Sequence, residues 1–118
     1  MKLSSLVALA VFGTCFLNAK RVEAKPFLYT DSYSHGGTAQ KCLANAKSTL
    51  KKLSFDNFRV DDSSKHLRSL SVKGYHQEEY IVAEIECNQK LGITILGVSG
   101  LDSEMTYEIY LKLHKAEW

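Results

Sequence analysis

Two of the three cysteines, Cys42 and Cys87, are the residues whose type and setting most directly predict chemistry. Neither belongs to a Cys-x-x-Cys pair, and neither has a plausible histidine partner, so redox catalysis is not indicated. In an oxidising compartment, two lone cysteines of a small domain usually pair. We therefore predict a structural disulfide between Cys42 and Cys87, and two free thiols are the alternative.

The histidines carry no metal signature, because no two of them have the spacing of metal ligands. They are His35, His66, His76 and His114. The first three fall in a leading segment and in turns, and the fourth falls in a C-terminal helix. A small enzyme or ligand carrier would need His35, His66 and His76 to converge near the strand ends, and we keep this as an alternative.

Other possible catalytic motifs are thin. Residues 48–51 spell Ser-x-x-Lys, but the partner motifs are missing and the chain is far too short for a penicillin-recognising enzyme. The acidic pairs Asp61-Asp62 and Glu78-Glu79 fall in turns, where neighbouring side chains on an extended chain point in opposite directions. Neither pair makes a carboxylate dyad or a calcium loop. The sequence thus predicts no catalytic residue, no metal and no cofactor.

The first 24 residues have the pattern of a signal peptide, with a short basic start, an apolar run and small residues before a cut ahead of Lys25. The run is too short and too weakly flanked for a membrane span. A lipid anchor on Cys15 would need a better lipobox than Phe12-Gly13-Thr14. We expect an exported protein, periplasmic or extracellular, without a stable membrane anchor.

Loss of this leader removes the net positive charge of the chain. The full sequence has 15 Lys and Arg against 13 Asp and Glu, and the leader contains three of the basic residues and one of the acidic ones. Residues 25–118 therefore hold 12 of each sign. A nucleic-acid partner would require a positive surplus, so we expect none.

Periodicity divides the rest of the chain into a flexible lead-in over 25–37 and a single α+β domain over 38–118. Thr38 is a good helix N-cap. The apolar positions after it have helical spacing and form one stripe. These are Ala39, Cys42, Leu43, Ala46, Leu50 and Leu53.

Strand signals follow at about 58–60, 68–75, 80–87 and 91–98. A three-residue loop at 88–90 would set Cys87 opposite Leu91 and Ile81 opposite Gly97, and a turn at 77–78 would set Gly74 opposite Ile81. Because strand side chains alternate between faces, these registers gather the apolar residues and Cys87 on one face. A bridge from Cys87 to Cys42 then requires the first helix to pack on that face.

The segment 103–115 fits either a helix or a strand. Asp102 or Ser103 would cap a helix after Gly100 ends the preceding strand, and we favour this interpretation. The predicted fold class is α+β: a helix, a three- to four-stranded antiparallel meander and a C-terminal helix, with both helices on one sheet face.

This pattern resembles a family of small exported bacterial proteins of unknown function over about residues 38–113. The resemblance implies a helix–sheet–helix arrangement in the periplasm and brings no catalytic residues. The matching residues are Cys42, Ala46, Leu50, Leu53, Gly74, Tyr80, Val82, Ile85, Cys87, Ile95, Val98, Gly100 and Asp102.

The predicted registers leave one sheet face open, and its aromatic and aliphatic end is the predicted partner-binding surface. The residues assigned to that surface are Tyr75, Tyr80, Val82, Leu96 and Val98. Two other occupants remain open: the lead-in, with Phe27, Tyr29 and Tyr33, could fold back over the face, or two copies could pair face to face.

The function hypothesis follows from that surface. We expect a non-catalytic exported protein that binds another protein, as an inhibitor or an immunity-type protein does. One alternative is the periplasmic ligand carrier or enzyme that would use the strand-end histidines. Another is a secreted eukaryotic effector, suggested by the dibasic pair Lys20-Arg21 and the small disulfide-linked design.

Overall fold

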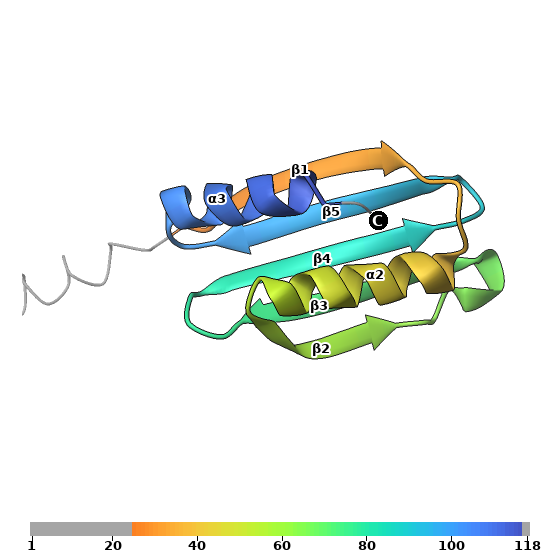
Figure 1. The fold of residues 1–118 in the computed structure, drawn as a ribbon, viewed down its shortest axis with the longest axis horizontal. Helices are drawn as coiled ribbons and strands as arrows, with labels where there is room; N and C mark the ends of the chain where they lie inside the picture. Colours follow the sequence, from red (N-terminus) through yellow and green to blue (C-terminus); the bar gives the residue numbers. More distant parts are fainter. Residues whose placement is uncertain (1–24, 117–118) are drawn as a thin grey trace, which may run out of the picture.

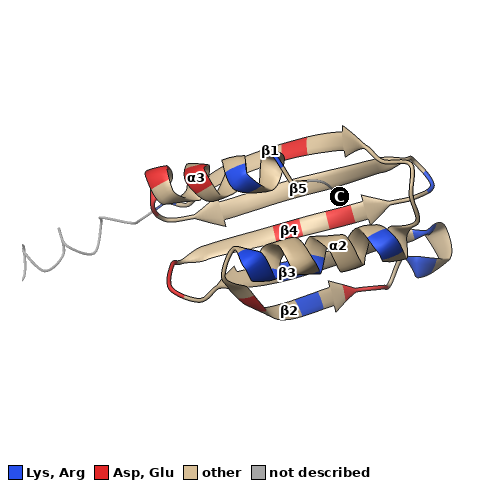
Figure 2. Cartoon of the chain, in the orientation of Figure 1, with Lys and Arg blue, Asp and Glu red and all other residues tan. Residues whose placement is uncertain are grey.

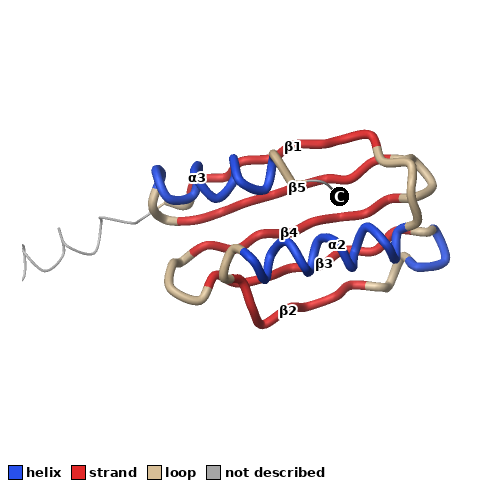
Figure 3. The backbone as a smooth tube through the Cα atoms, in the orientation of Figure 1, coloured by secondary structure: helices blue, strands red, loops and turns tan. Residues whose placement is uncertain are grey.

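A five-stranded antiparallel sheet carries two helices on one face in the computed structural model, which describes residues 25–116 (Figure 1). The strands lie in the order β1-β5-β4-β3-β2, and Figure 3 shows both helices running along the strands. The α+β prediction is confirmed, with one strand more than expected. The elements are β1 (Phe27–Ser34), α2 (Ala39–Lys52), β2 (Phe55–Asp61), the 3-10 turn η1 (Lys65–Leu67), β3 (Ser69–His76), β4 (Ile81–Asn88), β5 (Ile93–Gly100) and α3 (Ser103–His114).

Helix α2 begins where the sequence predicted, because the Thr38 side chain accepts a hydrogen bond from the Lys41 backbone N–H at 3.2 Å. The predicted apolar stripe faces the sheet. Its most buried members are Ala39, Cys42, Ala46 and Leu50. The helix packs over β3, β4 and β2.

Residues 103–114 form helix α3, which confirms the favoured interpretation of that segment. The Asp102 carboxylate accepts a hydrogen bond from the Met105 N–H at 2.8 Å and caps the helix. Thr106, Ile109 and Leu113 are its buried residues, and the helix packs over β5 and β1.

The predicted disulfide is confirmed. Cys42 on α2 and Cys87 on β4 are bonded, their Cα atoms are 6.0 Å apart, and both side chains are fully buried. The bond fastens α2 to the sheet face that carries the core. That core consists of Ala39, Cys42, Ala46, Leu50, Phe55, Leu70, Val72, Ile81, Ala83, Ile85, Cys87, Leu96, Val98, Ile109 and Leu113.

The segment 25–37 is not a flexible lead-in, which corrects the prediction. Strand β1 pairs with β5 over its whole length, from Phe27 opposite Gly100 to Ser34 opposite Ile93. Alternate side chains, those of Tyr29 and Tyr33 among them, are half-buried on the helix side. The segment therefore extends the sheet at its edge and does not fold back over the open face.

The predicted register of the β4–β5 hairpin is wrong by three positions. Cys87 lies opposite Thr94, and Ile81 lies opposite Gly100. The turn is longer than predicted because the Asn88 side chain accepts a hydrogen bond from the Leu91 N–H at 3.0 Å and Gly92 adopts a positive φ of 67°. An odd displacement turns every β5 side chain to the other face.

The same displacement corrects two of the predicted surface residues. Leu96 and Val98 are fully buried under the helices, so neither belongs to the open face. The register between β3 and β4 differs from the prediction by two positions, with Val72 opposite Ile85 and Gly74 opposite Ala83. An even displacement preserves the faces, so this difference moves no side chain into or out of the core.

The signal-peptide prediction concerns residues 1–24, which lie outside the described part of the chain. Within residues 25–116, neither helix has the length and apolar character to cross a bilayer.

Candidate functional site

The sheet face opposite the helices is hereafter called the open face. No helix or strand of the described residues covers it (Figure 1). Its side chains fall into rows that cross the five strands in register. Three rows span all five strands: Leu28, Ser99, Val82, Tyr75 and Asp56; Thr30, Gly97, Glu84, Lys73 and Arg59; Ser32, Ile95, Glu86, Ser71 and Asp61. A fourth row, of Ser34, Ile93, Asn88 and Ser69, spans four strands.

Three of the five predicted surface residues remain accessible. Tyr75 and Val82 lie opposite each other on the open face and are half-buried, while Tyr80 is 86% exposed in the turn between β3 and β4. The sequence reasoning missed Leu28 and Ile95, which are exposed on the same face. Both residues lie on the β1–β5 pair, and the correct register of that pair would have placed them on the open face.

Charge on the open face is mixed, with an acidic surplus. Figure 2 marks acidic positions along β4 and both signs along β2. Four carboxylates lie in the three rows against the two cations Arg59 and Lys73. The Lys73 Nζ is 4.0 Å from a Glu84 oxygen, and Arg59 lies 5.9 Å from the centre of the Tyr75 ring. Two of the other carboxylates accept hydrogen bonds: Glu86 accepts one from the Ser69 hydroxyl at 3.1 Å, and Asp61 accepts one from the Ser63 N–H at 2.9 Å.

A shallow hollow of about 260 Å³ lies at Gly97 in the middle of the open face. Thr30, Glu84, Glu86 and Ile95 line it together with Gly97. A Cβ atom added at Gly97 would meet no atom within 4 Å, and its φ is not positive. The fold therefore does not require glycine there, although glycine weakens a strand interior.

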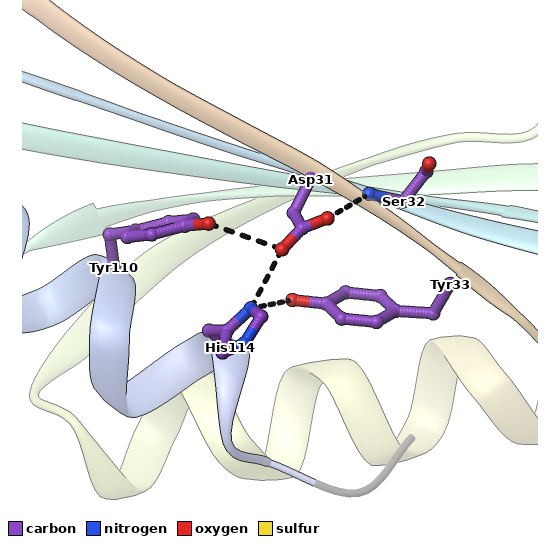
Figure 4. A network of polar contacts seen from close by, with 5 residues as sticks. All are labelled: Asp31, Ser32, Tyr33, Tyr110 and His114. Carbon is purple, nitrogen blue, oxygen red and sulfur yellow. Dashed lines mark hydrogen bonds and ion pairs between the residues drawn. The ribbon is translucent and has the colours of Figure 1, made fainter.

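A second cluster joins β1 to α3 on the helix side of the sheet. Asp31 and Tyr33 from β1 and Tyr110 and His114 from α3 point toward one another (Figure 4). The Asp31 Oδ2 is 2.7 Å from the His114 Nδ1 and accepts a hydrogen bond from the Tyr110 hydroxyl at 3.1 Å. The Tyr33 hydroxyl lies 2.9 Å from the same His114 nitrogen.

The cluster shifts the acidity of its members. The backbone N–H of Ser32 holds the pKa of Asp31 below its ordinary value against the opposing effect of burial, and Tyr110 and His114 add to this. Burial, with the negative charge of Asp31, raises the pKa of Tyr33 to about 12, so its hydroxyl stays protonated. No serine or cysteine side chain joins these contacts, and the cluster acts as a polar clamp that fastens β1 to α3.

The strand-end histidines are not brought together. His35 follows β1, and its backbone N–H donates a hydrogen bond to the Gly92 carbonyl at 2.7 Å. Its ring Nε2 is buried and has no hydrogen-bond partner among the described residues. His66 lies in η1 before β3, and His76 lies at the other end of β3, packed edge-on against Phe55. Within residues 25–116, no three His, Cys, Asp or Glu side chains are grouped so that they could hold a metal ion.

The class that these features define is a small α+β protein whose first helix is disulfide-linked to a central strand. Comparison of the chain with protein-family models, with curated proteins and with solved structures yields no match. The disulfide is the one feature of the described residues that indicates an oxidising compartment.

Proposed function

We propose that this protein is a non-catalytic exported binding protein, of the inhibitor or immunity type, that docks another protein on its open face. The observation that carries the proposal is the hollow at Gly97. A glycine inside a strand that no packing contact or φ value requires is typical of a place where another molecule approaches closely. The disulfide, which is typical of exported proteins, supports the location.

The lining of the hollow indicates which partner side chain fits it. Glu84 and Glu86 stand on one side, and Ile95 offers an apolar surface beside them. Arg and Lys lay their methylene stems along apolar surface and keep the charged head at a carboxylate. The partner would therefore present a basic side chain at this point, within a surface of complementary charge.

The apolar end of the open face would supply the rest of the contact. Tyr75 and Val82 lie one row away from Glu84, and the exposed Tyr80 follows in the adjacent turn. Aromatic and aliphatic side chains at the centre of an interface, with charges around them, are the usual composition of such surfaces. Tyr80→Asp should weaken capture of the partner from periplasmic or culture fluid without unfolding the protein.

A defined probe tests the hollow before any partner is known. The ¹⁵N-labelled protein is titrated with the blocked tripeptide Ala-Arg-Ala, and with Ala-citrulline-Ala as the uncharged match. We expect the arginine peptide alone to shift the amides of Gly97, Glu84 and Ile95, with a dissociation constant on the order of 1 mM and a strong salt dependence.

Three variants separate the hollow from the rest of the face. Gly97→Val fills the hollow and should abolish the shifts, while Ser99→Val, the next open-face position of β5, should keep them. Glu84→Gln with Glu86→Gln should also abolish them. Shifts that persist in Gly97→Val, or that spread over both faces of the sheet, would contradict the proposal.

A further inference from the structure

The two edges of the sheet differ in how they are protected. Edge strand β2 has a register irregularity between Asp56 and Arg59, a positive φ of 50° at Asn57, and exposed charges along it. Bulges and charges are the devices that keep a sheet edge from pairing with another chain. The β2 edge is therefore blunted.

Edge strand β1 has none of these devices. All eight of its residues pair with β5 without a register shift, and no proline or lysine lies within it. Its one charged side chain, Asp31, is already engaged by Tyr110 and His114. Phe27 and Leu28 on the strand and Tyr107 on the helix above it are among the exposed large apolar side chains.

We propose that the outer edge of β1, which no strand of residues 25–116 pairs with, pairs with β1 of a second copy of this chain. The two strands would be antiparallel and related by a twofold axis normal to the sheet. An extended strand that adds to an exposed sheet edge gains main-chain hydrogen bonds, and a twofold interface needs a surface that is complementary to itself. Strand β1 is complementary to itself in this sense, because it carries no uncompensated charge and two copies of it do not repel each other.

Two registers pair the greatest length of β1, with the twofold axis at Thr30 or at Asp31, and the side chains select between these two. A twofold axis normal to the sheet keeps all the helices on one side of the dimer. In that arrangement, one residue of β1 lies next to the axis and faces the same residue of the second copy. An axis at Asp31 would set two carboxylates directly opposite each other, which is destabilising. An axis at Thr30 pairs threonine with threonine, sets Asp31 opposite the Tyr29 of the second copy, and leaves the strand paired from Phe27 to Tyr33.

The resulting dimer would have one continuous sheet with all helices on one side. Both open faces would then lie on the other side. The dimer does not depend on the proposed function, although Thr30 belongs both to the dimer axis and to the lining of the hollow. Sedimentation equilibrium of the purified protein over a range of concentrations should yield a mass twice that of the monomer. Thr30→Lys should raise the dissociation constant of the dimer roughly fivefold or more. Val60→Lys, at the exposed β2 edge, is the matched control and should leave it unchanged.

Cysteine trapping tests the register itself. Opposed residues of antiparallel strands have Cα atoms about 4.5–5.5 Å apart, within the range that a disulfide spans. Oxidised Thr30→Cys should therefore run as a covalent dimer on a non-reducing gel, and Ser34→Cys, off the axis, should not. A monomer at all concentrations, or equal trapping at both positions, would overturn the proposal, and trapping at Asp31→Cys in place of Thr30→Cys would overturn the register.

Discussion

Gly97→Ala and Gly100→Ala add the same methyl group to β5 at positions three residues apart, and the structure predicts opposite effects on stability. Gly100 is buried at the end of β5, against Thr106 in the first turn of α3. A Cβ atom there would overlap the Thr106 Oγ1 and lie 2.9 Å from the Ile81 Cγ1, closer than real Cβ atoms pack. A Cβ atom at Gly97 would stand in open space.

The two effects have different magnitudes as well as different signs. Overpacking of a core costs about 1–3 kcal/mol, because helix and sheet must move apart or a side chain must leave its rotamer. Replacing glycine by alanine at an unstrained position stabilises by about 0.4–1 kcal/mol through the entropy of the unfolded chain. The free energies of unfolding of the two variants should therefore differ by about 1.5–4 kcal/mol.

Urea unfolding of the oxidised protein, followed by far-UV circular dichroism, measures this difference directly. In a domain of this size, each kcal/mol also moves the melting temperature by about 4–8 °C. If Gly97→Ala destabilises the protein as much as Gly100→Ala does, Gly97 lies in the core. The β4–β5 register described above, and the hollow with it, would then be refuted.

Two further predictions concern the disulfide and the polar clamp. The pair Cys42→Ala with Cys87→Ala should lower the free energy of unfolding by about 4 kcal/mol, because the bond closes a loop across a separation of 45 residues; an unchanged urea midpoint would contradict this. The lowered pKa of Asp31 stabilises the fold above the unfolded-state value near 4, and this contribution is lost as the pH falls through the native pKa. Thermal melts from pH 7 to pH 3 should therefore show a smaller acid loss in Asp31→Asn than in the wild type, and equal losses would exclude Asp31 as a source.

The helices and the disulfide could be predicted from the sequence, because helical spacing places Cys42 on the same apolar stripe as Ala46 and Leu50. It was insufficient for the register of β5. That strand is apolar on both faces, with Ile93 and Ile95 on one and Leu96 and Val98 on the other, so alternation alone cannot choose the buried side. The choice depends on turn length, which the Asn88 side chain and the φ of Gly92 determine.

Strand β1 was missed for a different reason. Its residues are mostly polar or aromatic, and it follows a proline, so a strand and an extended lead-in look alike in sequence. What holds it to α3 is the contact of Asp31 with His114, which lie 83 residues apart. No local pattern encodes a contact of that separation, and the clamp became visible only with the fold.

The register of β5 decides what kind of partner the open face suits. With Leu96 and Val98 exposed, the face would be an apolar patch that favours any hydrophobic surface. With them buried, Ile95 and Gly97 come out beside the carboxylates of Glu84 and Glu86, and the patch becomes a hollow with an acidic wall. Covering a carboxylate is costly unless a cation pairs closely with it, and the Lys73–Glu84 pair is long at 4.0 Å. In the proposed interaction, such a face would reject an apolar partner and favour one that brings a cation. The specificity of the proposed interaction therefore rests on a turn that lies outside the interaction surface itself.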